Sequence, residues 1–557
     1  MRNGRPDSGV ALWDKSHNGE SMGPTSSSVS GHPIAVKCLL SGMLLLAALK
    51  LWLIGGVEII GMEFDAQSYL VMAQHWYWDQ LWMYVRPPIF PLYVAVVHEF
   101  GIPLRLANEA IYLAASASIA LALLNLCYPR WAVLALFALL AFLPSSIAIL
   151  SLATPEVIIA PLTLLMTAEI VRTLTGDGRR LWVHATWLAL ISALLWYARP
   201  ETILVFGGLA VAPMLTLGAG VFRIMPLRQV MPLSAALIGL PAAAIAILGL
   251  VIAIMNGRHF GRFFSGDDLH APAFVRAYAL LQAIDVGAAV RYVPVSHDQL
   301  TKAEAVSPAF REIAPFFRSE RGEYYKKVSL QYAGVENEFA GGWWIFVFRE
   351  AVAQAGYHSV AETDAFYTRL ANEIEAARDT GQISLRWSPS SFVDPKYEVW
   401  FPHVAASFAR VMTHLDPSRP PPLTVEPKLA PEITQIFNVM ANRRAALADT
   451  GPRQNIQRLE IFLKPVRWLY NWTLAAVLSI GLILLIAGGW QNLSLPILGL
   501  LGVSFVMIAG RVAIFTLVDA SSFPILESYR YLFPATAALP VLVMAVGALY
   551  FSKPWGA

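Results

Sequence analysis

Long apolar segments are the feature that most restricts what this chain can fold into. A bilayer core about 30 Å thick is crossed by a helix of roughly 20 apolar residues. Ten segments approach that length, near residues 34–57, 104–127, 131–149, 155–173, 182–198, 201–219, 231–255, 466–488, 493–517 and 531–552. Charged residues make up 14% of the chain, compared with roughly 25% in soluble domains. The sequence therefore predicts an all-α polytopic membrane protein with about ten transmembrane helices.

The positions of Lys and Arg predict the side of each connection, because short cytoplasmic loops collect these residues. If the N-terminus is cytoplasmic, nearly every inner segment carries positive charge. These residues are Arg2, Arg5, Lys15, Lys37, Arg130, Arg179, Arg180, Arg223, Arg228 and Lys553. The apolar segment 88–101 is too short to span the membrane comfortably, so we interpret it as interfacial or re-entrant. If it did span, the side of the membrane assigned to every later connection would be reversed. We expect an integral plasma (inner) membrane protein with both termini in the cytoplasm.

Four parts follow from this topology. They are a disordered cytoplasmic tail at 1–32, an N-terminal transmembrane module at 33–255 with its first exoplasmic loop at 58–103, an exoplasmic domain at 256–465, and C-terminal transmembrane helices at 466–557. The exoplasmic domain is predicted to be soluble and mainly helical, with amphipathic patterns at 343–357 and around 364–383. Cys38 and Cys127 are the two cysteines and are both expected near cytoplasmic span ends, so we predict no structural disulfide.

Short polar motifs interrupt the apolar sequence at the ends of the predicted spans. They are "EFDAQSY" at 63–69, "RPP" at 86–88, "TPE" at 154–156, "ARPE" at 198–201 and "ESYRY" at 527–531. Under the predicted topology all five face the exoplasmic side. Any chemistry is therefore expected at that face of the membrane.

Asp65 is the acidic residue that most resembles a catalytic group. It begins a segment in which Tyr69, Met72, Ala73, Trp76 and Gln80 recur at helical spacing, which predicts an amphipathic helix on the membrane surface. Asp65 could simply cap that helix, since caps favour Asp. Alternatively it is a general base, a role that contributes on the order of 10²–10⁴ in rate.

Four other acids are supporting or acceptor-binding candidates. Glu63 is the rival of Asp65, but residues two apart point in different directions at a helix start. Glu156 and Glu201 begin outward helix ends, where the helix dipole favours carboxylates. Structural roles for this pair are as well supported as catalytic ones. Glu527 opens the "ESYRY" motif.

Basic residues at the same span ends could hold a phosphate, because a guanidinium fork matches phosphate oxygens. Arg86, Arg199 and Arg530 are candidates, although each could instead snorkel to the interface or form a salt bridge such as Arg199 with Glu201. Arg530 is the most specific of these phosphate-binding candidates, because tyrosines flank it on both sides, including Tyr531. Lys50 lies inside the first span, where it could snorkel or meet an anionic lipid.

The motifs "DAQSYL", "RPPIFPLYVA" and "ESYRYLFPA" resemble those of the C-type (GT-C) glycosyltransferases, which are polytopic enzymes that use polyprenyl-phosphate sugars. The similar members are bacterial, in the mannosyltransferase-like and aminoarabinose-transferase-like branch. The resemblance implies that Asp65 is the catalytic base, with Tyr69 and Ala73 also fitting, and that 33–255 is a catalytic module. By the same resemblance, the "RPP" and "RY" elements of the family correspond to Arg86, Pro87, Pro88, Arg530 and Tyr531.

This chain departs from the family pattern at one informative position. Many members have Asp-Glu where this chain has Asp65 and Ala66. The missing second carboxylate disfavours a divalent metal, and no cofactor or metal site is predicted. The motifs extend over the first 200 and the last 90 residues, so the resemblance does not reach the 256–465 domain.

Residues and resemblance together predict an inverting glycosyltransferase, hexosyl or pentosyl. It would move a sugar from a polyprenyl-phosphate donor to a hydroxyl of an exoplasmic cell-envelope glycan, lipid or protein. No P-loop, GxSxG, HExxH or paired CxxC motif is present, and no nucleic-acid partner is predicted. The alternatives are a lipid or glycolipid flippase or transporter, which would show broken and repeated helices, and a non-catalytic membrane scaffold. Consumption of a polyprenyl-phosphate sugar would separate these classes.

Overall fold

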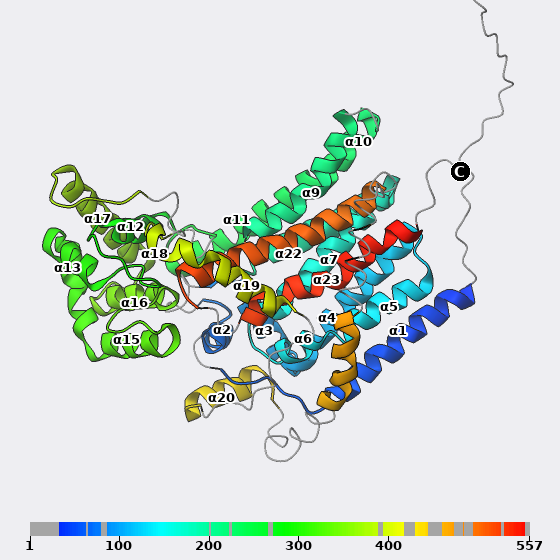
Figure 1. The fold of residues 1–557 in the computed structure, drawn as a ribbon, viewed down its shortest axis with the longest axis horizontal. Helices are drawn as coiled ribbons and strands as arrows, with labels where there is room; N and C mark the ends of the chain where they lie inside the picture. The colour runs from blue at the N-terminus through cyan, green and yellow to red at the C-terminus, as the bar shows by residue number, and fades with distance from the viewer. Residues whose placement is uncertain are drawn as a thin grey trace, which may run out of the picture.

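The fold is known from a computed structural model. It describes residues 33–62, 65–78, 86–199, 202–221, 225–265, 271–387, 394–416, 429–443, 459–472, 479, 483, 494–524 and 528–551. All named elements in these ranges are helices, with one isolated antiparallel bridge between Ile284 and Leu385. The chain is therefore an all-α protein, as expected. Figure 1 shows long helices filling most of the molecule and a group of shorter helices, α12 to α17, at one end.

Within the described ranges, seven helices are long and apolar enough to cross a membrane. Their membrane-crossing segments are Ile34–Leu53, Leu104–Leu126, Glu156–Thr175, Leu204–Val221, Leu227–Phe260, Leu495–Ser521 and Tyr529–Gly547. They correspond to α1 (Pro33–Leu53), α4 (Leu104–Ala122), α7 (Glu156–Thr175), α9 (Thr202–Val221), α10 with α11 (Leu227–Ser234 and Leu240–Phe260), α22 (Leu495–Ser521) and α23 (Ser528–Phe551). The integral membrane character predicted from the sequence agrees with these helices.

Three of the ten expected spans do not appear among these seven. Segment 131–149 forms two short helices, α5 (Arg130–Ala141) and α6 (Pro144–Ile149), because Pro144 lacks an N–H and ends the preceding helix. Segment 182–198 forms α8 (Gly178–Trp196), which has Arg179 and Arg180 in its first turn. Segment 466–488 lies partly outside the described residues.

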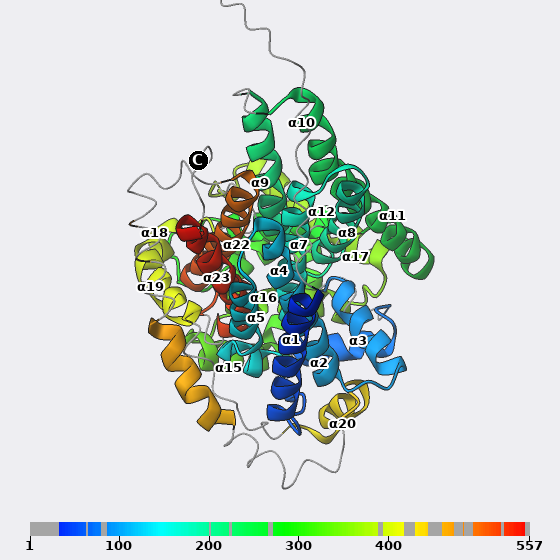
Figure 2. The same cartoon turned by 90° about the vertical axis from the view of Figure 1, so that its right-hand side faces the viewer.

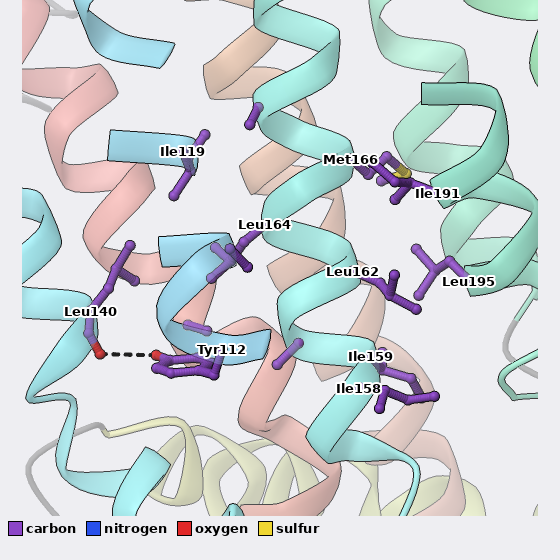
Figure 3. Close-up of a cluster of buried hydrophobic side chains, with 14 of the residues drawn as sticks. Tyr112, Ile119, Leu140, Ile158, Ile159, Leu162, Leu164, Met166, Ile191 and Leu195 are labelled. Carbon is purple, nitrogen blue, oxygen red and sulfur yellow. Dashed lines mark hydrogen bonds between the residues drawn. The ribbon is translucent and has the colours of Figure 1, made fainter. Parts of the chain in front are cut away.

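α7 lies at the centre of the membrane part. It is the most buried of the seven candidate spans and packs against α4, α8, α22 and α23. Figure 3 shows Leu162 and Met166 of α7 near Ile191 and Leu195 of α8, and Tyr112 of α4 on the other side. The Tyr112 hydroxyl donates a hydrogen bond to the carbonyl oxygen of Leu140 at 3.0 Å. This buried core fixes the N-terminal end of α7, from which the cavity described below is built.

A second core lies in the helices between α11 and α18. It is formed by α12 (Pro272–Ala283), α13 (His297–Val306), α14 (Pro308–Ile313), α15 (Glu320–Ala333), α16 (Gly341–Gln354) and α17 (Val360–Asp379). The amphipathic pattern expected around 364–383 forms α17, and its apolar residues Phe366, Leu370, Ile374 and Ala377 are buried. Ser359 and Glu362 form a capping box at the start of this helix, and Gly381 follows its end with φ of 73°.

The last helices of the 256–465 segment pack on the membrane part and lie outside this second core. α19 (Val404–Leu415) packs against α22 and α23, whereas α20 (Pro431–Met440) packs against α2 (Asp65–Gln74) and α3 (Ile89–Glu99). In Figure 2, α19 (yellow) lies at one flank of the bundle and α11 (green) at the opposite flank. α18 (Tyr397–Trp400) lies between α17 and α19 in the chain.

α3 matches the short apolar segment that was interpreted as too short to span, but α2 differs from its expected form. It ends at Gln74, where an amphipathic helix through Gln80 was predicted. The chain turns back at Trp76 and Tyr77, which have positive φ, and the Tyr77 amide donates to the Met72 carbonyl at 2.7 Å. Six of its ten residues are buried. α2 is therefore packed between α3 and α20, and it lacks the single apolar face of a surface helix.

Candidate functional site

A cavity of about 250 Å³ lies where the membrane part meets the second core. It is lined from six places in the chain: α2, the segment before α3, the start of α7, the end of α8, the start of α16 and the start of α23. Its lining residues are Asp65, Tyr69, Arg86, Pro87, Thr154, Pro155, Glu156, Arg199, Gly342, Ile345, Phe346, Arg530 and Tyr531. All five polar motifs singled out in the sequence contribute at least one of these residues.

Asp65 lies between two guanidinium groups. Its Oδ1 accepts from Nη2 of Arg86 at 2.5 Å, and its Oδ2 accepts from Nη2 of Arg530 at 3.1 Å. Ser68 helps to orient Arg86: its Oγ accepts from Arg86 Nε at 3.3 Å while donating to the Asp65 carbonyl at 2.8 Å. Asp65 is the first residue of α2, so the helix start presents the carboxylate to both arginines.

The electrostatic surroundings keep Asp65 ionised. Burial by itself raises the pKa of the Asp65 carboxyl, but Arg86, Arg530 and Arg199 together hold that pKa well below its usual value. Burial acts in the same direction on its neighbour Tyr69, where it outweighs the nearby arginines and raises the pKa of the phenol to about 12. At neutral pH the cavity therefore contains an aspartate anion and a protonated Tyr69, and only the first can accept a proton.

A second ion pair crosses the cavity beside the first. Arg199, which follows α8, pairs with Glu156 at the start of α7. This acid lies 43 residues earlier in the chain, whereas Glu201, the partner that the sequence offered as an alternative, lies outside the described residues. Arg199 also lies over the ring of Tyr531, with its Cζ 4.8 Å from the ring centre. Its charge is consequently held between a carboxylate and an aromatic face.

Arg530 shares the same tyrosine. Its Cζ lies 4.5 Å from the Tyr531 ring centre, and its Nη2 donates to the Tyr531 hydroxyl at 2.5 Å. Arg199 and Arg530 are therefore brought to one aromatic ring at the start of α23. Together with Arg86, three arginines and two carboxylates line the cavity, so arginine charge exceeds carboxylate charge by one.

α16 is the part of the cavity wall that the sequence did not predict. Arg86 lies over two rings: its Cζ is 4.8 Å from the centre of Tyr69 and 5.4 Å from that of Phe346. Phe346, Ile345 and Gly342 all come from α16. The segment 343–357 reads as an ordinary amphipathic helix, and the one local signal was the glycine pair before it. A Cβ on Gly341 would lie 2.5 Å from the carbonyl oxygen of Ser522, so the glycine permits close contact between α16 and the end of α22.

The structure places Lys50 away from the cavity. Its Nζ lies 2.8 Å from Oε2 of Glu109 on α4 and donates to Oγ of Ser146 on α6 at 3.1 Å. Arg105 contacts the same glutamate at 2.7 Å. The expected roles of snorkelling outward or meeting an anionic lipid do not match this buried ion pair, which forms because a charge inside a span needs a partner.

Three candidate acids, Glu63, Glu201 and Glu527, lie outside the described residues. Among the described residues, no cluster of three or more His, Cys, Asp or Glu side chains has a metal-binding arrangement.

Comparison with known proteins gives one structural match. No protein-family model matches the sequence, and no curated protein matches it. The chain resembles the crystal structure of ArnT from Cupriavidus metallidurans in the apo state, with 11% sequence identity and a TM-score of 0.28. The match covers 92% of this chain and 77% of that chain. At this level of similarity the functional interpretation depends on the cavity itself.

Proposed function

We propose that the protein is an inverting glycosyltransferase that moves a sugar from a polyprenyl-phosphate donor to a hydroxyl acceptor in the cell envelope. The observation that carries the proposal is the carboxylate of Asp65 held between Arg86 and Arg530 in one cavity. The motifs that resemble the C-type glycosyltransferases also line this cavity. The proposal places the cavity on the exoplasmic face of the plasma membrane.

The proposed reaction is a single displacement at the anomeric carbon. Asp65 accepts the proton of the acceptor hydroxyl, whose oxygen forms a bond to that carbon. The bond from the anomeric carbon to the phosphate oxygen breaks, and the phosphate leaves with the electron pair. Negative charge grows on the phosphate in the transition state, so guanidinium groups placed there accelerate the reaction. Arg86, Arg530 and Arg199 are the proposed phosphate ligands.

The two ion pairs suggest how donor binding prepares the base. While Asp65 is paired with two arginines, its pKa is lowered and it is a weak proton acceptor. A donor phosphate that binds Arg86 and Arg530 would compete with Asp65 for both guanidinium groups. The carboxylate would then lose part of the positive field that lowers its pKa and become more basic. Donor binding would thus precede activation of the acceptor.

The test is Asp65→Asn in the full-length protein with radiolabelled polyprenyl-phosphate sugars and envelope acceptors. Asn keeps the size and capping ability of Asp but cannot act as a base. We expect normal folding, donor binding largely retained and turnover reduced by about 10²-fold or more. The matched control is Asp285→Asn, which removes a carboxylate that pairs with Arg386 at 3.1 Å in the second core. Its turnover should equal that of the wild type.

Transfer by the Asn variant at more than about a tenth of the wild-type rate, with chemistry rate-limiting, would remove Asp65 as the base. No consumption of any lipid-phosphate sugar by the wild-type protein would instead favour the transporter or scaffold alternatives.

A further inference from the structure

One face of α19 is packed on the membrane helices. Its Val411 and Leu415 are buried in a cluster with Ile508 and Val512 of α22. The cluster also includes Phe515, Leu532, Ala535 and Ala538 from α22 and α23. Arg410, although partly exposed, reaches the same helices: its Nη1 lies 3.3 Å from the buried carboxylate of Asp519 on α22.

Apolar side chains that flank this packed face are exposed. Phe408 is 48% exposed and Met412 is 43% exposed, and Ala405 lies on the same side. Spacings of three and four residues place these side chains on one stripe of the helix. Phe401, just before α19, extends the apolar surface and is 67% exposed. A helix of a soluble domain would carry polar residues on this outward face.

The depth of the contacts on α22 identifies what covers that face. α22 has 27 residues, which corresponds to about 40 Å at 1.5 Å per residue. The hydrocarbon layer is about 30 Å thick, so about 10 Å, or roughly seven residues, is surplus. If the whole surplus projected beyond Ser521, Ile508 and Val512 would still lie within the layer. Val411 and Leu415 of α19 pack against these two residues and are therefore at membrane depth.

α22, against which α19 packs, also exposes apolar side chains. Phe505 and Leu517 of α22 are 62% and 45% exposed on a candidate span. His414 is turned away from the outside, with its ring 4.4 Å from that of Tyr529 at the start of α23. Ser407 of α19 is thus buried against protein, while its apolar stripe of Phe408 and Met412 is exposed to the surroundings of the bundle.

We infer that α19 is embedded in the leaflet nearer the cavity and that Phe408 and Met412 contact lipid acyl chains. The segment between the second core and α20 therefore anchors the second core to the bilayer. It is a lipid-binding element of the membrane part, although it lies within the region that the sequence assigned to a soluble exoplasmic domain. This inference is independent of the proposed transferase activity.

Spin labels in the full-length protein in proteoliposomes test this inference. Labels are attached to Phe408→Cys and, separately, Met412→Cys after replacement of Cys38 and Cys127 by Ser. Leu330→Cys on α15 is the matched control, because Leu330 is apolar and 50% exposed on the second core. Dissolved oxygen concentrates in lipid, whereas a nickel chelate stays in water. We expect oxygen collisions to dominate at 408 and 412 and nickel-chelate collisions to dominate at 330.

Two outcomes would overturn the inference. Nickel-chelate accessibility at 408 and 412 equal to that at 330 would mean that the face is in water. Shielding of both positions from oxygen and from the chelate would mean that protein, such as a second copy of this chain, covers α19.

Discussion

At the scale of single residues, Arg530 links the proposed base to the proposed phosphate site. Its Nη2 contacts both Asp65 and the hydroxyl of Tyr531, and its guanidinium lies over the Tyr531 ring. Lysine would keep the charge but lose the planar fork and the stacking. We expect Arg530→Lys to fold normally and to bind donor about tenfold more weakly, or about 1.4 kcal/mol, and Arg530→Ala to bind it more weakly still.

Donor titration of the purified variants measures this effect. Arg318→Lys is the control, because Arg318 pairs with Glu304 at 2.8 Å on the surface of the second core, far along the chain from the cavity motifs. Unchanged donor affinity and turnover in both Arg530 variants would make Arg530 an interfacial anchor only.

At the scale of elements, the contact between α16 and the end of α22 completes the cavity wall. Gly341 is essential to this contact, because an added Cβ would meet the Ser522 carbonyl at 2.5 Å. Gly341→Ala should force α16 outward, shift Phe346 from Arg86 and cost about 1–3 kcal/mol, as overpacking does. The temperature at which the full-length protein unfolds and its turnover of donor should both fall. Gly218→Ala is the control, because its added Cβ has no neighbour within 4 Å. In this variant the unfolding temperature and the turnover should stay unchanged or increase. Equal behaviour of the two variants would show that α16 does not need this close approach.

At the scale of the whole molecule, α7 sets the distance between the cavity and the far surface of the membrane. It runs from Glu156 at the cavity to Thr175 and has 20 residues, which corresponds to about 30 Å. Arg179 follows its far end, whereas Leu330 belongs to the second core, whose α16 reaches the cavity. Figure 1 shows α15, the helix that carries Leu330, at the outer end of the molecule. We therefore predict that Arg179 and Leu330 lie on opposite sides of the membrane.

Single cysteines at 179 and 330, labelled in intact cells with a membrane-impermeant maleimide, test this prediction. Position 330 should react in intact cells, whereas position 179 should react only after permeabilisation. Equal access at both positions would contradict the topology and every side assignment derived from it.

The sequence alone determined the features that depend on neighbouring residues. Apolar length predicted α1, α4, α7, α9, α11, α22 and α23, because transfer of a helix into a bilayer sums contributions along one segment. The amphipathic pattern that predicted α17 was equally local. The motif residues were recognised as candidates because polar motifs interrupt the apolar sequence at the span ends and because a guanidinium group matches phosphate oxygens.

Only the tertiary structure decided which charges are partners. Asp65 and Arg530 are 465 residues apart, and Arg199 pairs with Glu156 although Glu201 was nearer in sequence. Lys50 is neutralised by Glu109 on another helix. α16 and α19 join the cavity wall and the membrane helices, respectively, although both belong to one polar-looking segment. An ion pair or a packed face is a property of distance in space, and local patterns of hydrophobicity and charge contain no information about which distant segments will meet.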